Sequence, residues 1–121
     1  MTKEFNNSYD LEERTARFGE AVILFVRSIK VDNVNNPLIN QVVRSATSVG
    51  ANYMEANGAS SKRDFRNKIH FCKKEAQETK HWLRMLAKAN PQKLDDCKHL
   101  WQEAHELSLI FGKITSTLNK K

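Results

Sequence analysis

The sequence predicts an all-α protein that folds as an up-down-up-down antiparallel four-helix bundle. Apolar residues recur at three- and four-residue spacing through most of the 121 residues, which is the period of an amphipathic helix. Only four glycines and two prolines are present, so signals for hairpin turns are scarce. Short connectors between the periodic segments favour antiparallel neighbours. Because a chain of this length forms one core, we expect a single domain over residues 1–121.

The first helix is predicted over about residues 11–30. Its core-facing stripe consists of Leu11, Thr15, Phe18, Val22, Phe25 and Ile29. Ile23, Leu24 and Val26 add apolar area outside this stripe, which is more than one core-facing side requires. We therefore expect a second contact surface on this helix, buried between subunits.

The second helix is predicted over about residues 37–56, with Asn36 as its N-cap and Pro37 as its first residue. Small residues alternate with its apolar positions and let another helix approach closely. They are Ser45, Ala46, Ser48, Gly50 and Ala51. Because Gly50 costs a helix roughly 1 kcal/mol relative to alanine, we expect a packing reason for it.

The third helix is predicted over about residues 62–89 and the fourth over about residues 91–118. Ser61 caps the third helix, and the fourth begins at Pro91. In the resulting hairpin, residues equally far from position 90 lie at similar heights. Cys72 and Cys97 are then roughly 16 Å apart along the bundle, beyond the ~7 Å limit of a disulfide. We predict no intrachain disulfide, a core position for Cys72, and a reducing cytoplasm around the protein.

The net positive charge of the chain arises from the third predicted helix. The formal net charge of +6 arises from 20 basic and 14 acidic residues. Residues 61–89 hold nine basic and three acidic residues, so the other 11 basic and 11 acidic residues cancel. The segment that carries the net charge is therefore the first place to look for an anionic partner.

Six polar residues on this helix form a stripe one residue, or about 100°, away from its apolar stripe. They are Arg66, His70, Lys73, Gln77, Lys80 and Arg84. The stripe is about 27 Å long, which matches several successive phosphates at roughly 3.4 Å spacing in a duplex strand. No aromatic residue is interleaved in it, so backbone contact is expected rather than base-specific reading.

The predicted nucleic-acid-binding residues are the charged members of this stripe together with the cations at the two ends of the helix. They are Lys62, Arg63, Arg66, His70, Lys73, Lys80, Arg84 and Lys88. The alternative is a face that only keeps the protein soluble, which is the usual role of a charged helix flank.

Other chemistry finds little support in the sequence. Because it contains no glycine-rich phosphate loop, nucleophile elbow or convergent Ser/His/Asp pattern, we predict no catalytic residue and no cofactor. His81 and His99 are equally far from position 90 and could approach each other, with Cys97 or His105 nearby. No HxxxH pair accompanies them, and no metal site is predicted. The polar first seven residues and the short apolar run at 21–26 favour a cytoplasmic protein without membrane contact.

Three sequence blocks together resemble a known family. Residues 41–56 read QVVRSATSVGANYMEA, Asp64-Phe65 and Lys68-Ile69 follow, and residues 74–83 read KEAQETKHWL. In this order and spacing they resemble the four-helix-bundle family named for 23S rRNA intervening-sequence proteins, also called S23-like. The resemblance covers about residues 11–118.

The resemblance implies a four-helix bundle that assembles as a homopentamer. Members of the family are encoded in insertions within large-subunit rRNA genes, and no defined chemical activity is associated with them. The family is also similar in structure to the accessory protein of diversity-generating retroelements, a basic pentamer thought to bind nucleic acid and a reverse transcriptase. Polar signature residues are expected to make structural contacts between helices or subunits. They are Asn52, Glu55, Glu75 and Glu78.

The leading hypothesis is a non-enzymatic oligomeric scaffold that binds the backbone of RNA or DNA through the stripe, with several copies adding avidity. The competing hypothesis is a structural or protein-interaction module whose basic face recognises an acidic protein partner.

Overall fold

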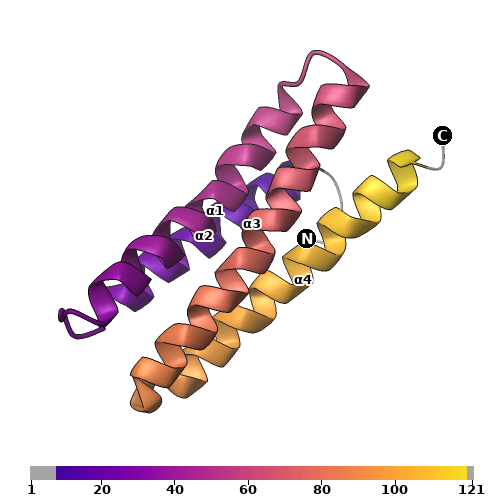
Figure 1. Ribbon diagram of the computed structural model, residues 1–121. Helices are drawn as coiled ribbons and strands as arrows, with labels where there is room; N and C mark the ends of the chain where they lie inside the picture. Colours follow the sequence, from indigo (N-terminus) through magenta and orange to yellow (C-terminus); the bar gives the residue numbers. More distant parts are fainter. Residues whose placement is uncertain (1–7, 120–121) are drawn as a thin grey trace.

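The protein is a bundle of four α-helices, as predicted (Figure 1). The computed structural model describes residues 8–119; residues 1–7 and 120–121, which the predicted domain includes, lie outside them. The helices are α1 (Ser8–Val26), α2 (Asn35–Asn57), α3 (Lys62–Ala89) and α4 (Leu94–Asn119), with a short 3-10 helix, η1 (Pro91–Lys93), before α4. None of these helices is long and apolar enough to cross a membrane.

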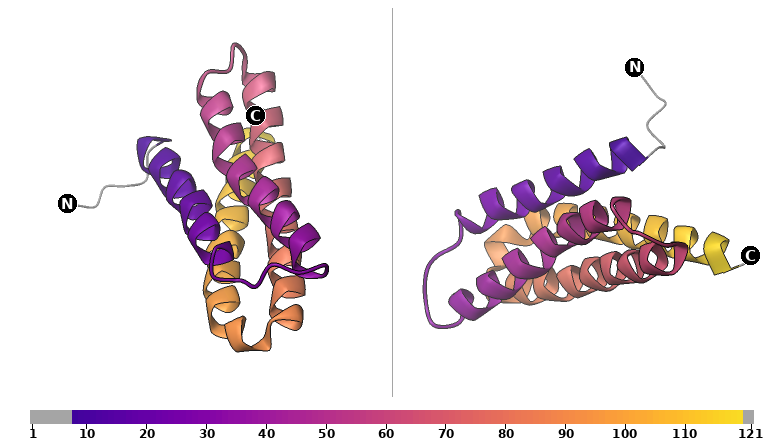
Figure 2. Two further views of the ribbon diagram at one scale, coloured as in Figure 1. Left: turned by 90° about the vertical axis from the view of Figure 1, so that its left-hand side faces the viewer. Right: turned by 90° about the horizontal axis from the view of Figure 1, so that it is seen from above.

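Consecutive helices run in opposite directions and pack side by side (Figure 1). The α2–α3 and α3–α4 pairs make extensive contact, whereas α1 packs mainly on α2 and only sparsely on α4. Figure 2 shows the reason, because the N-terminal end of α1 stays beside α2 but leans away from α4. α3 therefore has two close neighbours, and its two flanks face different helices.

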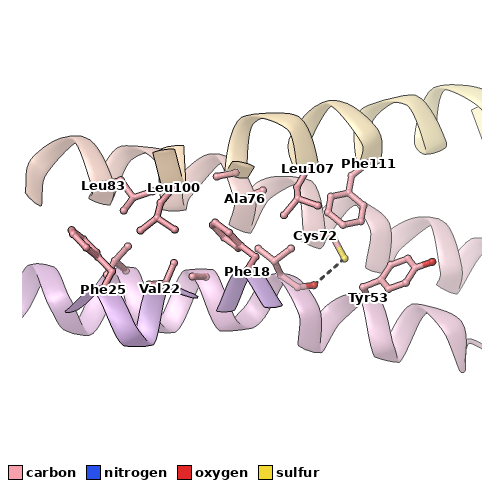
Figure 3. Packing of buried hydrophobic residues seen from close by; sticks show 14 of the residues in the cluster. Phe18, Val22, Phe25, Tyr53, Cys72, Ala76, Leu83, Leu100, Leu107 and Phe111 are labelled. Carbon is pink, nitrogen blue, oxygen red and sulfur yellow. Dashed lines mark hydrogen bonds between the residues drawn. The ribbon is translucent and has the colours of Figure 1, made fainter. Parts of the chain in front are cut away.

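The predicted apolar stripes form the core (Figure 3). All six stripe residues predicted for the first helix are buried, and so are Ile69, Cys72, Ala76, Thr79, Leu83 and Leu86 of α3. The Cys72 thiol donates to the carbonyl oxygen of Val49 at 3.6 Å, and burial raises the pKa of this thiol to about 12. Cys72 and Cys97 are both unpaired, so Cys72 is a small core residue with an unreactive thiol.

The ends of the first two helices differ from the prediction. α1 ends at Val26 rather than at residue 30, because the chain continues in turns in which the hydroxyl of Ser28 donates to the carbonyl oxygen of Phe25 at 2.6 Å. Asn36 is not the N-cap of α2, since α2 begins at Asn35. Oδ1 of Asp32 accepts hydrogen bonds from the backbone N–H groups of Val34 and Asn35 at 3.0 and 2.7 Å.

The connectors at one end of the bundle are joined by a buried pair of amides. Asn35 Nδ2 donates to Asn90 Oδ1 at 3.2 Å, and Asn90 Nδ2 donates to Asn35 Oδ1 at 2.8 Å. Because Asn35 is the first residue of α2 and Asn90 lies between α3 and η1, the pair fixes the relative position of the two helical hairpins.

Candidate nucleic-acid interface

The α2-facing side of α3 carries carboxylates that are already paired. Glu75 and Glu78 both bind Arg44 of α2, and Glu78 also accepts a hydrogen bond from Trp82 Nε1 at 3.1 Å. About two turns earlier on α3, Lys68 Nζ lies 2.8 Å from Oε1 of Glu55 on α2. Ion pairs therefore cross the α2–α3 interface, and they involve three of the four residues expected to make structural contacts.

Asn52, the fourth of those residues, acts within its own helix. Its side chain is half-buried, and its Nδ2 donates to the carbonyl oxygen of Ser48 at 2.9 Å. This is the common i to i−4 bond of a polar residue in a helix interior.

The opposite side of α3 faces α4 and carries cations. Lys73 is half-buried and lies across Gly112 of α4, where an added Cβ would be 3.6 Å from Nζ and 3.7 Å from Cε. Lys80 Nζ lies 3.1 Å from Nδ1 of His105. The long side chains of Lys73 and Lys80 thus rest on α4 while their charges stay at the edge of the bundle.

The other cations of the predicted stripe share this side of α3 by helical register. Arg66 is half-buried, and His70 and Arg84 are exposed. We call Arg66, His70, Lys73, Lys80 and Arg84 the basic flank. Within residues 8–119, none of these five side chains forms an ion pair with a carboxylate.

The remaining predicted binding residues lie at the ends of the same helix. Lys62 and Arg63 are exposed in the first turn of α3, and Lys88 is exposed in its last turn. All three continue the positive surface beyond the basic flank, and they are too far along the helix to rest on the middle of α4.

Between Lys98 and Gly112, the side of α4 that faces the basic flank contains no acidic residue. Lys98, Trp101, His105, Leu109 and Gly112 recur there at three- and four-residue spacing. We call the surface formed by this side of α4 and the basic flank the α3–α4 face. It combines the cations of α3 with Lys98 and the aromatic and apolar residues of α4.

Sequence reasoning did not place two aromatic side chains of the α3–α4 face beside the cations. Trp101 and His105 stack with ring centroids 5.0 Å apart and an interplanar angle of 16°. Lys80 Nζ lies 4.9 Å from the centroid of the Trp101 ring. The absence of aromatic residues within the stripe of α3 therefore did not mean their absence beside it. The height relation of the hairpin contained the signal, because it places Lys80 level with residue 100.

The suggested approach of His81 to His99 does not occur. His81 is exposed and contacts the edge of Trp82, with ring centroids 4.9 Å apart, whereas His99 lines the cleft between α1 and α4. Their heights match, but their side chains lie on different faces. Across residues 8–119, no group of three or more His, Cys, Asp or Glu side chains is arranged to hold a metal ion.

The cleft between α1 and α4 has a volume of about 820 Å³, and the arginine and glutamate side chains that line it are paired. Arg14 donates from Nε and Nη2 to the two carboxylate oxygens of Glu103, at 2.7 and 2.9 Å, and from Nη2 to Glu106 at 2.9 Å. Hydrogen bonds from Gln102 and Arg14 lower the pKa of Glu106. These ion pairs join α1 to α4 along the cleft.

Comparisons with known proteins agree with this fold. The sequence profile of the 23S rRNA-intervening sequence protein family matches residues 8–113. A crystal structure of a protein with unknown function from the S23 ribosomal protein family of Bacteroides thetaiotaomicron is similar, with a TM-score of 0.77 and 27% sequence identity. The similarity covers 87% of this chain and 97% of that chain. No curated protein matches the chain. Because the family match extends over most of the sequence, the chain belongs to the 23S rRNA-intervening sequence protein family.

Proposed function

We propose that this protein is a non-enzymatic oligomeric scaffold in the cytoplasm that binds RNA or DNA through the basic flank of α3. The observation that carries the proposal is the separation of charge on one helix. The carboxylates Glu75 and Glu78 are paired with Arg44 on the α2 side, whereas the cations on the α4 side have no acidic partner within the described residues.

Contact with the sugar-phosphate backbone explains this arrangement better than solubility does. A solubilising surface works with both signs mixed, and mixed charges would gain about 0.3–0.5 kcal/mol from each i,i+4 pair. A row of cations without acids instead raises the local potential for a polyanion and releases its counterions on binding. Phosphates also need no base-specific groups, so a row of charged side chains is sufficient to contact them.

The salt dependence of binding tests this proposal. We expect that replacing Arg66, Lys73, Lys80 and Arg84 together by Gln weakens binding of labelled RNA and DNA oligonucleotides steeply. For about four phosphate contacts in one engaged subunit, the slope of log affinity against log salt should be roughly −3 to −4, and it should flatten in the variant. Fluorescence anisotropy at several salt concentrations measures both quantities.

A matched control separates the basic flank from the total charge. The control replaces two other arginines and two other lysines that are exposed and lie outside the α3–α4 face. They are Arg17, Arg27, Lys30 and Lys113. Their replacement by Gln removes the same charge, so affinity and slope should change much less than in the first variant. Circular dichroism should show intact helices in both, because exposed charges contribute little to folding. Equal losses in the two variants, or no binding by the unmodified protein, would contradict the proposal and favour an acidic protein partner for the basic flank.

The oligomeric part of the proposal is supported by apolar residues left open on one side of α1 and α2. Leu24 is 70% exposed, Met54 58% and Ile23 39%. Ile23 and Met54 line a shallow groove between α1 and α2 together with Ala16 and Ala51. A second copy that covered this groove would remove the apolar surface from water, and a homopentamer is the assembly that the resemblance implies.

A further inference from the structure

We propose that the α3–α4 face binds single-stranded nucleic acid and that one base stacks on Trp101. This inference rests on the proposed function of the basic flank and names the form of nucleic acid that it takes. The residues that carry it are Trp101 and His105 of α4 and Lys80 of α3.

The indole ring of Trp101 is held in place by two neighbours and remains partly exposed. His105 stacks on it at 5.0 Å between centroids, and Lys80 Nζ lies 4.9 Å from its centroid. Even so, 36% of Trp101 remains exposed. An exposed indole in a helical bundle normally loses conformational entropy when it binds a partner, and this one is already positioned by two neighbours.

Lys80 links the aromatic ring to the basic flank. Its ammonium group belongs to the row of cations and also lies against Trp101 and His105. A phosphate bound near Lys80 therefore places the attached nucleotide beside the indole, because only one sugar separates a phosphate from its base. A base that stacked there would extend an existing aromatic pair, as bases do on the aromatic platforms of single-strand-binding proteins.

A duplex cannot use this platform. Its bases are stacked inside the helix and present only their edges in the grooves, so a ring at the side of a helical bundle would reach phosphates and sugars alone. The bases of a single strand have free faces. The pairing of a cationic row with one accessible aromatic ring thus favours a single strand.

Two other aromatic residues, Trp82 and Phe71, do not serve this purpose. Trp82 is half-buried and its Nε1 donates to Glu78, so it lies beside the carboxylates of the α2 side. Phe71 is 46% exposed, but by helical register it shares that side rather than the basic flank. Trp101 is the aromatic residue whose ring is in contact with a cation of the basic flank.

The test compares a 15-nucleotide oligothymidylate with a mixed-sequence 15-base-pair DNA duplex, by anisotropy at one salt concentration. We expect tighter binding of the single strand. Replacing Trp101 by Leu should lower the single-strand affinity by about 5- to 100-fold, the loss of one base stack, and should leave duplex binding nearly unchanged. Trp101→Phe keeps a ring and should restore most of the affinity. Val31→Ala removes an exposed apolar side chain from the α1–α2 connector, away from the proposed site, and should have little effect.

A spectroscopic readout separates stacking from a general effect on the surface. In a Trp82→Phe background Trp101 is the sole tryptophan, and the oligothymidylate should quench its fluorescence while the duplex does not. Equal affinity for single strand and duplex, with no effect of Trp101→Leu, would overturn this inference and leave the proposed function standing. If the unmodified protein bound neither the single strand nor the duplex, this inference and the proposed function would both be overturned.

Discussion

Gly50 and Gly112 allow the packing of α1 on α2 to be measured with a built-in control. Both glycines lie inside helices and neither has a positive φ, so each costs its helix roughly 1 kcal/mol relative to alanine. Their surroundings differ. A Cβ at Gly50 would lie 3.3 Å from Oγ1 of Thr15 and 3.4 Å from the carbonyl carbon and oxygen of the same residue. At Gly112 the nearest atoms are the flexible end of Lys73, at 3.6 Å or more.

These distances decide the sign of each substitution. Gly112→Ala should stabilise the protein by up to roughly 1 kcal/mol, because Lys73 can move aside. Gly50→Ala gains the same propensity but pushes against the backbone of α1 at Thr15, which is only 2% exposed. Overpacking of this kind costs about 1–3 kcal/mol, so the net effect should range from neutral to a loss of about 2 kcal/mol.

Urea unfolding followed by circular dichroism, at one protein concentration, gives both free energies of unfolding. The two variants should differ by about 1–3 kcal/mol, with Gly112→Ala the more stable. If Gly50→Ala stabilised the protein as much as Gly112→Ala, the close approach of α1 to α2 would not constrain position 50, and the packing reason for this glycine would be wrong.

Two further predictions concern the core and the assembly. Burial raises the pKa of the Cys72 thiol from 9.0 to about 12, so the stability that this group contributes is intact below pH 9 and is lost as the pH rises from 9 toward 12. Urea midpoints at pH 8 and 10.5 should therefore fall less in Cys72→Ala than in the unmodified protein, and equal falls would contradict the shift. Light scattering at micromolar concentration should give a multiple of the 14.0 kDa chain mass, and Leu24→Asp should lower it whereas Leu109→Asp, also at an exposed leucine, should not. A mass near 14 kDa for the unmodified protein would refute the assembly.

Periodicity alone was enough to predict the core. Thr15, Phe18 and Val22 are buried where the four-three spacing placed them, because a helix has only one face that can meet its neighbours in a bundle. The reason for Gly50 also follows the expectation of a close helix, but the helix is α1 of the same chain. The close-packing face of α2 is thus partly used within one subunit, and Ala51 and Met54 remain on its open side.

Helix ends and side-chain partners across helices were harder to predict. Asp32 and Asn36 both suit a cap, and the choice depended on which backbone N–H groups the connector directs at a carboxylate. His81 and His99 show a second limit, since the hairpin fixes the height of a residue but not its direction around the helix. The same limit hid Trp101, whose place beside Lys80 depends on the rotation of α4.

The spacing of the cations on α3 limits the repulsion between them. Arg66, Lys73 and Lys80 are seven residues apart, about 10.5 Å along the helix, which is close to three phosphate steps of roughly 3.4 Å in a duplex strand. The residues between them on the same side, His70 and Gln77, are a histidine and a neutral amide, so neighbouring lysines and arginines one turn apart are mostly avoided. Each pair of like charges at i,i+4 destabilises a helix by only a few tenths of a kcal/mol, so with this spacing the row of cations lowers the stability of the protein little. Stability does not require the row, because the ion pairs of Arg44 and Lys68 already join α3 to α2 on the other side. The side toward α4 is therefore free to carry cations for a ligand.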